Sequence, residues 1–180
     1  MTSIITSATQ AAHSAAASLL AKAQIQPGQP IPQVDVKESA PDQTTTIPLT
    51  GKNVIVGVPG AFSGTCSNSH VPGYLQNYDK FKAKGINEIY VVSVNDVFVM
   101  KAWKEKLAPT GSPVHFLADD KGALVTSLGL LFDATGFFGA PRAKRFVIVT
   151  EGDKAQIVAV EENPGEVKVT GAETILAQLA

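Results

Sequence analysis

A short β-branched run that leads into a small polar turn and the only cysteine most constrains how this chain can fold. Residues 54–58 read Val-Ile-Val-Gly-Val, which is typical of a strand buried on both faces. The Pro-Gly pair at residues 59–60 ends that strand. Residues 63–65, Ser-Gly-Thr, are of types that cap helices, and the apolar spacing predicts a helix over residues 66–82. Cys66 therefore stands where a buried strand gives way to a helix.

The position of Cys66 has a chemical consequence. The first turn of a helix carries unpaired backbone N–H groups and the positive end of the helix dipole, and both favour a thiolate over a thiol. A lone cysteine is more commonly a small buried apolar residue. The polar Ser-Gly-Thr-Cys-Ser turn around this cysteine favours a reactive nucleophile instead.

Composition excludes several classes of protein. A chain of 180 residues with 44% hydrophobic content suits one domain with a full core. The formal charge of −1 provides no basic face for nucleic acid or for an anionic membrane, and no apolar run has the length of a membrane span. A single cysteine forms no intramolecular disulfide, so we expect a reducing compartment. Three scattered histidines and one cysteine supply no zinc site, and we expect no metal and no other cofactor.

The first 26 residues differ from the remainder of the chain. Residues 1–26 are rich in Ala, Ser and Thr and contain no acidic residue, so we treat them as an N-terminal extension and residues 27–180 as the folded domain. The alanine content favours a helix over residues 9–23. The alternative is a mitochondrial transit peptide, but such peptides are usually rich in arginine and this segment has none. We therefore expect a cytoplasmic protein.

The rest of the chain alternates between strand and helix patterns. Strands are expected at residues 33–37, 44–49, 89–94 and 114–118, and helices over residues 97–107 and in a short segment that ends at Leu128. This alternation predicts an α/β sandwich.

The last third of the chain has a different pattern. Residues 145–150 and 156–160 flank a Glu-Gly-Asp-Lys turn and should pair as an antiparallel hairpin. Thr170 should then cap a closing helix that ends at Leu179. A parallel core finished by a hairpin and a helix is the thioredoxin-like fold, in which a mixed central sheet has helices on both faces.

Several motifs resemble those of one family. The motifs are Pro-Gly-Ala-Phe-Ser-Gly-Thr-Cys-Ser at residues 59–67, His-Val-Pro-Gly-Tyr at 70–74, Lys-Ala-Lys-Gly at 82–85, Ser-Val-Asn-Asp at 93–96, Leu-Ala-Asp at 117–119 and Lys-Arg-Phe at 144–146. Together they resemble the peroxiredoxins, specifically the peroxiredoxin-5 type and the type II proteins of fungi and plants. The resemblance covers residues 33–179 in one collinear pass.

This resemblance implies a thiol peroxidase with a defined set of catalytic residues. The Cys66 thiolate would attack the terminal peroxide oxygen and become a sulfenic acid, with release of water or an alcohol. Ser63, where the family most often has threonine, would hydrogen-bond the peroxide. Arg145 would stabilise both the thiolate and the negative charge that develops on the leaving oxygen. Pro59 would shield the sulfur from water, and the backbone N–H groups of Thr65 and Cys66 would point at the substrate.

Other residues are expected to complete the substrate site. They are Gly64, His70 and Phe138. His70 lies one helical turn after Cys66, where a histidine acts either as a hydrogen-bonding support or as a proton shuttle. Arg142 is the alternative guanidinium to Arg145.

Two geometric expectations follow from these positions. Arg145 begins its strand, whereas Cys66 follows the end of residues 54–58, so the two meet only if these strands run antiparallel. Pro72 falls inside the predicted helix and should kink it. We expect the first turn, residues 66–69, to loosen separately and release the oxidised sulfur.

The absence of a second cysteine defines the rest of the catalytic cycle. Family members often carry a resolving cysteine in the C-terminal segment, but here residues 167–170 read Val-Lys-Val-Thr. The resemblance therefore implies that an external thiol, either glutathione with glutaredoxin or thioredoxin, reduces the sulfenic acid. It also implies a homodimer. Two other classes stay open, namely a cysteine hydrolase with His70 as base and a redox sensor or binding module without turnover.

Overall fold

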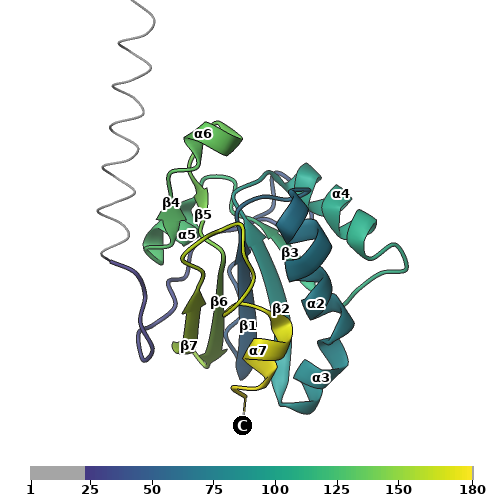
Figure 1. The fold of residues 1–180 in the computed structure, drawn as a ribbon, viewed down its shortest axis with the longest axis vertical. Coiled ribbons are helices and arrows are strands. Elements are labelled where there is room, and N and C mark those ends of the chain that lie inside the picture. The colour runs from purple at the N-terminus through teal and green to yellow at the C-terminus, as the bar shows by residue number, and fades with distance from the viewer. Residues whose placement is uncertain (1–22, 180) are drawn as a thin grey trace, which may run out of the picture.

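A five-stranded mixed sheet forms the centre of the computed structural model, which describes residues 23–179. Strand β1 (Lys52–Val58) pairs in parallel with β2 (Ile86–Ser93), which pairs in parallel with β3 (His115–Ala118). On its other side β1 pairs antiparallel with β6 (Phe146–Glu151), and β6 pairs antiparallel with β7 (Lys154–Val160). The order is β3-β2-β1-β6-β7 (Figure 1). The predicted mixed sheet and the closing hairpin are confirmed.

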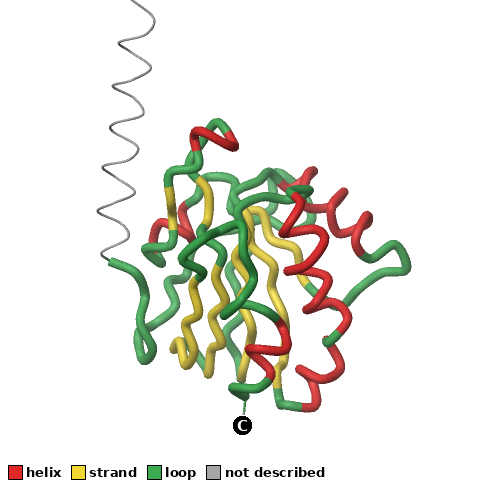
Figure 2. The backbone as a smooth tube through the Cα atoms, in the orientation of Figure 1, coloured by secondary structure: helices red, strands yellow, loops and turns green. Residues whose placement is uncertain are grey.

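Helices cover both faces of this sheet, as the thioredoxin-like fold requires (Figure 2). On one face, side chains of β1 such as Val54 and Val56 pack in a core with residues from four helices: α2 (Val71–Gln76), α3 (Tyr78–Ala83), α4 (Val97–Leu107) and α7 (Ala172–Leu176). On the other face, Ile55 packs with α5 (Ala123–Ser127) and with residues from the stretch 25–47. Because both faces are covered, β1 is buried from Asn53 to its end.

Two predicted strands do not form. Residues 33–37 and 44–49 meet only through an isolated bridge between Val36 and Thr45, and Lys37 bridges separately to Ala118 at the edge of β3. Pro48 lies within the second predicted strand and has no N–H to donate, which prevents a continuous ladder there.

The single helix predicted over residues 66–82 is divided into three parts. The first is a π-helical turn, η1 (Cys66–His70), in which the N–H of Val71 donates to the carbonyl of Cys66. Helix α2 follows with Pro72 in its first turn, and Asn77 separates it from α3. Since Pro72 has no N–H and its ring crowds the preceding turn, the π-helical turn directly before it is consistent with a local disturbance of the helix at this proline.

The end of the chain also departs from the prediction. Helix α7 ends at Leu176 rather than Leu179, and Gly171, not Thr170, occupies its N-cap position. The Thr170 hydroxyl donates instead to Oε1 of Glu161 at 2.8 Å. Three short elements were not predicted, because two to four residues carry no recognisable period: β4 (Leu131–Phe132), α6 (Thr135–Phe138) and β5 (Arg142–Ala143).

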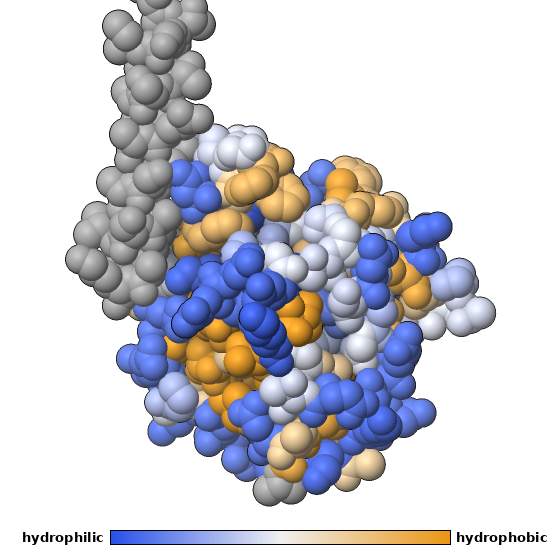
Figure 3. Space-filling view, in the orientation of Figure 1, coloured by the Kyte–Doolittle hydropathy of each residue, from blue (hydrophilic) through white to orange (hydrophobic). Residues whose placement is uncertain are grey.

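Several large aromatic side chains remain exposed at one end of the molecule. Phe137 is 91% exposed, Phe98 is 65% exposed and Phe62 is 53% exposed. Figure 3 shows apolar groups over α6 and near the start of α4. Within residues 23–179, no helix combines the length and the apolar character that a bilayer crossing needs.

Candidate active site

Cys66 lies in the first turn after the loop that follows β1, and its side chain is completely buried. Because β1 and β6 run antiparallel, the end of β1 lies beside the start of β6, and Arg145 immediately precedes that strand. The Nη2 atom of Arg145 donates to the Cys66 sulfur at 3.4 Å. The sheet thus brings together two residues that are far apart in the sequence, in the antiparallel arrangement that the sequence required.

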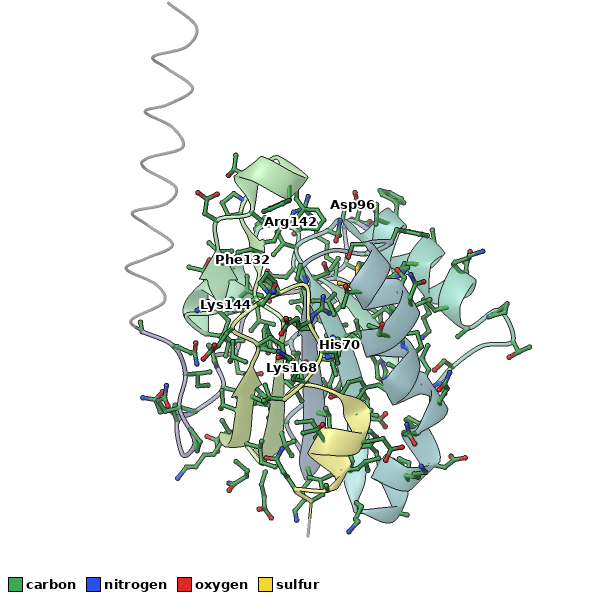
Figure 4. The ribbon with its side chains drawn as sticks, in the orientation of Figure 1. His70, Asp96, Phe132, Arg142, Lys144 and Lys168 are labelled. Atoms are coloured by element: carbon green, nitrogen blue, oxygen red, sulfur yellow. The ribbon has the colours of Figure 1, made fainter. Side chains whose placement is uncertain are left out.

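The other guanidinium lies elsewhere. Nη1 of Arg142 donates to the carbonyl of Val94 at 2.5 Å, and its guanidinium carbon lies 5.3 Å from the centre of the Phe138 ring. Figure 4 shows Arg142 near α6, well separated from His70. Arg142 therefore supports the loops around the site, and it is Arg145 that the structure places beside the sulfur.

A close approach between β1 and β6 sets the position of Arg145. Gly57 pairs with Phe146 across the two strands. A Cβ atom at position 57 would lie 1.9 Å from the Phe146 ring, so only glycine leaves space for this ring. Since Arg145 is the next residue along the chain, this packing also places its backbone beside the end of β1.

Protein acceptors hold the Arg145 guanidinium firmly. Nε and Nη2 both donate to the carbonyl of Pro164, at 3.0 and 2.7 Å, and Nη1 contacts Nδ1 of His70 at 3.0 Å. Arg145 is only 1% exposed. Within the described part of the chain, no carboxylate forms an ion pair with it. Its positive charge is therefore buried, has no carboxylate in direct contact among residues 23–179 and is directed at the sulfur.

The contacts of His70 define its protonation state. A guanidinium can only donate, so Nδ1 of His70 accepts from Arg145, and the remaining ring proton lies on Nε2. Nε2 donates to the carbonyl of Thr170 at 3.0 Å. Burial and the nearby Arg145 charge lower the pKa of His70 to about 3. His70 is thus a neutral acceptor for Arg145, and because both ring nitrogens contact protein groups, this geometry fits a hydrogen-bonding support better than a proton shuttle.

The hydroxyl groups before Cys66 do not cap the helix, contrary to the expectation from their residue types. The Ser63 hydroxyl donates to the carbonyl of Gly60 at 2.9 Å, which leaves its lone pairs free to accept from a ligand. The Thr65 hydroxyl donates to the carbonyl of Gly165 at 3.0 Å. The N–H of Ser67 donates to the carbonyl of Ser63 at 2.9 Å. The N–H groups of residues 64–66 therefore lie in the first helical turn, where N–H groups have no partner within the helix.

A cavity of about 450 Å³ opens next to Cys66. Six of the eight predicted site residues line it: Pro59, Ser63, Gly64, Thr65, Phe138 and Arg145. The other two, Cys66 and His70, are buried behind this wall. Phe132, Phe137 and Pro164 make the rest of the wall largely apolar. A cavity of this size and character has room for hydrogen peroxide and also for the apolar part of an organic hydroperoxide.

Sequence reasoning missed the loop that completes the site. Pro164, Gly165 and Thr170 contribute backbone carbonyls to Arg145, Thr65 and His70. No signal in the sequence could have identified them, because every residue type carries the same carbonyl. As regards metals, residues 23–179 contain no group of three or more His, Cys, Asp or Glu side chains arranged to hold an ion.

Comparisons with known proteins agree with this site. Residues 26–176 match the redoxin family. The chain is 44% identical over 153 residues to peroxisomal membrane associated protein 20 of Schizosaccharomyces pombe, which covers 84% of this chain and 97% of that protein. It is 43% identical over 147 residues to the mitochondrial peroxiredoxin-2F of Arabidopsis thaliana, with 79% of this chain and 73% of that protein covered.

A solved structure extends the agreement to three dimensions. The structure of reduced Prx3 from Vibrio vulnificus in complex with hydrogen peroxide matches with a TM-score of 0.79 and 37% identity, and covers 87% of this chain and 100% of that one. With the cysteine, the arginine and the cavity placed as described, the chain belongs to the peroxiredoxins, a family of thiol peroxidases, and resembles the type II proteins of fungi and plants.

Proposed function

We propose that the protein reduces hydrogen peroxide and organic hydroperoxides at Cys66. The thiolate sulfur attacks the terminal peroxide oxygen, the O–O bond breaks, and a proton completes the water or alcohol that leaves. The sulfur is oxidised to a sulfenic acid and the peroxide is reduced by two electrons. The contact of 3.4 Å between Nη2 of Arg145 and the sulfur carries this proposal, because it directs a positive charge at the reacting atoms.

The other site residues take the roles that their positions allow. Ser63 accepts a hydrogen bond from the peroxide, and the backbone N–H groups of Thr65 and Cys66 stabilise the oxygen on which negative charge develops. Pro59 and Phe138 exclude water from the reacting atoms. Their place on the cavity wall beside the sulfur supports these assignments.

Two further residues act on substrate access and on the arginine. Gly64 leaves the cavity wall open, since a Cβ atom there would meet no heavy atom within 4 Å. His70 orients Arg145 through the contact at Nδ1.

An external thiol completes the catalytic cycle. The chain has one cysteine, so a thiol donor attacks the sulfenic sulfur, water leaves and a mixed disulfide forms. A second donor thiol then releases the reduced enzyme and a donor disulfide. Glutathione with glutaredoxin, or thioredoxin, supplies the thiol. Because Cys66 is completely buried, this attack requires the first turn, residues 66–69, to loosen and release the oxidised sulfur.

The exposed aromatic residues support a homodimer. Phe62, Phe98 and Phe137 lie at the end of the molecule that carries the site, and an apolar surface of this kind favours contact with a second copy. We also propose that residues 27–180 form the peroxiredoxin domain, with residues 1–26 as an extension. The cytoplasm is the proposed location, and the mitochondrion is the alternative if that extension is a transit peptide.

Peroxide-dependent consumption of a thiol donor tests the proposed function. The wild type should turn over with dithiothreitol, and Cys66→Ser should be inactive. Oxidation of Cys66 without turnover under any donor would instead indicate a redox sensor. Cleavage of esters or amides would indicate a cysteine hydrolase with His70 as base, and either result would overturn the proposal.

A further inference from the structure

One loop, residues 161–170, supplies backbone carbonyl acceptors to the site, and we name it the carbonyl loop. It leads from β7 to the start of α7 and crosses in front of the sheet (Figures 1 and 2). Its carbonyl groups accept hydrogen bonds from three side chains of the site: Thr65, His70 and Arg145. The position of the Arg145 guanidinium therefore depends on what fixes this loop.

A single buried carboxylate ties the loop together. Oε1 of Glu161 accepts from the N–H of Lys168 at 2.6 Å, from the N–H of Thr170 at 2.9 Å and from the Thr170 hydroxyl at 2.8 Å. The N–H of Glu161 itself donates to the carbonyl of Arg145 at 3.0 Å. Glu161 is 7% exposed. It thus joins the first residue of the loop to the last, directly beside the backbone of Arg145.

From Glu161 a continuous series of contacts leads to the sulfur. The carboxylate holds Thr170, whose carbonyl accepts from Nε2 of His70 at 3.0 Å and from the Tyr74 hydroxyl at 2.6 Å. Nδ1 of His70 accepts from Arg145, and Arg145 donates to Cys66. Figure 4 labels His70 at the centre of the molecule and Lys168 on the loop. Every contact in this series lies at ordinary hydrogen-bond distance.

The Thr170 carbonyl holds the ring of His70 in place. It accepts from Nε2 while Arg145 donates to Nδ1, so both contacts require the same tautomer, with the proton on Nε2. If the carbonyl turned away, Nε2–H would lose its buried acceptor and the ring could rotate. Arg145 would then lose a fixed partner and its direction toward the sulfur.

Glu161 is suited to this task only as an anion. Burial works against ionisation, but the hydrogen bonds from Thr170 and Lys168 outweigh it and lower the pKa of Glu161 below its ordinary value. An ionised carboxylate is a pure acceptor and can hold three donors on one oxygen. The amide of a glutamine at this place is a weaker acceptor and carries no charge.

We propose that Glu161 is a positioning residue of the peroxidase reaction, which fixes the ring of His70 and the direction of Arg145 through Thr170. The proposal rests on the proposed function of Cys66. It adds a residue that does not line the large cavity and touches neither the peroxide nor the sulfur.

The test compares Glu161→Gln with Glu162→Gln. Glu162 is the next residue, is exposed and forms no hydrogen bond or salt bridge within residues 23–179, so it is a matched control. The rate constant for oxidation of Cys66 by hydrogen peroxide, measured in single turnover, should fall about tenfold in Glu161→Gln, on the scale of one lost charged hydrogen bond. The control should keep the wild-type rate. Equal rates in wild type and Glu161→Gln would overturn the inference.

A double substitution separates positioning from a general loss of structure. In an Arg145→Ala background, Glu161→Gln should cause no further loss of rate, because the residue on which it acts is absent. A further tenfold fall there would overturn the inference. If Glu161→Gln does not fold, Thr170→Val takes its place, since it removes one of the three donors and keeps the carbonyl. It should lower the rate about threefold, and an unchanged rate would count against the proposal.

Failure of this inference is distinct from failure of the proposed function. A wild type that does not reduce peroxide contradicts the role of Cys66 itself. A wild type that is active, with Glu161→Gln equally active, contradicts only the role of Glu161.

Discussion

Two histidines in different regions of this protein have opposite electrostatic surroundings. His70 lies behind the candidate active site, where burial and the Arg145 charge lower its pKa to about 3. His115 lies at the outer edge of the sheet, stacked on Tyr90 with 5.0 Å between ring centres. A hydrogen bond from Nδ1 of His115 to Glu38 at 2.9 Å raises its pKa, despite the opposing effect of burial.

The two regions differ in whether a positively charged side chain is in direct contact with a carboxylate. At the edge, Nδ1 of His115 contacts Glu38, and Nε2 lies 3.6 Å from Glu88. The nearby Lys104 opposes protonation of His115 more weakly than these carboxylates favour it. A positive charge on His115 is therefore in direct contact with carboxylates. At the site, a neutral histidine supports a guanidinium that has no carboxylate partner among residues 23–179. Charges in direct contact contribute to stability, whereas a buried cation that is not in direct contact with a carboxylate remains available to stabilise negative charge on a reacting group.

The largest effect should come from removing the buried cation at Arg145. Arg145→Ala should lower the rate constant for Cys66 oxidation by at least about tenfold, on a scale of about 2–4 kcal/mol for a lost transition-state donor. Arg142→Ala is the matched control, because Arg142 contacts the Val94 carbonyl and not the sulfur. Stopped-flow measurement with hydrogen peroxide distinguishes the two. A greater loss with Arg142→Ala would mean that the wrong guanidinium has been assigned.

A smaller effect should come from disturbing the strands that bring the cation to the sulfur. In Gly57→Ala, the added methyl group would collide with the Phe146 ring and should lower the free energy of unfolding by about 1–3 kcal/mol. Gly136→Ala is a suitable control, because a Cβ atom there meets no heavy atom within 4 Å. Urea denaturation followed by circular dichroism measures both variants. Equal stability of the two would show that the β1–β6 approach is not tightly packed.

The smallest effect on stability is expected from substitution of His115, which contacts carboxylates at the sheet edge. The pKa of His115 is raised in the folded state, so its stabilising contribution is complete below the unfolded value of about 6.5 and is lost as pH rises through the folded value. The side chain is 34% exposed, and solvent screening should keep the contribution below about 1 kcal/mol. His115→Gln should therefore reduce stability more at about pH 5.5 than at about pH 9, because the stacking on Tyr90 is lost at both pH values and the charged contact only at the lower one.

The rate of Cys66 oxidation by peroxide should respond differently from stability in the His115→Gln variant. His115→Gln should leave the rate of Cys66 oxidation unchanged, because the edge cluster has no contact with the site. A loss of stability that is the same at both pH values would contradict the protonated state of His115, and a loss of rate would contradict the separation of the two regions.

Long periodic segments were predictable from the sequence, and short aperiodic ones were not. The helix predicted over residues 97–107 forms with the same bounds, and the Asp96 side chain caps it by accepting from the N–H of Val99 at 2.9 Å. Residues 33–37 and 44–49 have a strand composition but find only bridge partners. Thr170 has the residue type of a helix cap but is held by Glu161 instead, so tertiary contacts override the local preference.

Some contacts of the candidate site were likewise predictable from the sequence, and others were not. The meeting of Cys66 and Arg145 could be predicted, because strand direction alone decides whether the two ends coincide. The support of Arg145 by Pro164, and of His70 by Thr170, could not, since backbone carbonyls have no signature in the sequence. The same limit hid Glu161, whose role depends on which donors surround it.

A competition experiment tests the central claim most directly, namely that this site makes the Cys66 sulfur react faster with peroxide than an ordinary thiol. Reduced protein is mixed with N-acetylcysteine in about 100-fold excess and with less peroxide than protein, and the mixture is quenched with acid within a single turnover. The total oxidation of Cys66, as sulfenic acid and as mixed disulfide with N-acetylcysteine, is then measured by mass spectrometry. Most of the peroxide should oxidise Cys66 despite the excess of free thiol. Oxidation shared in proportion to the two thiol concentrations would contradict the account.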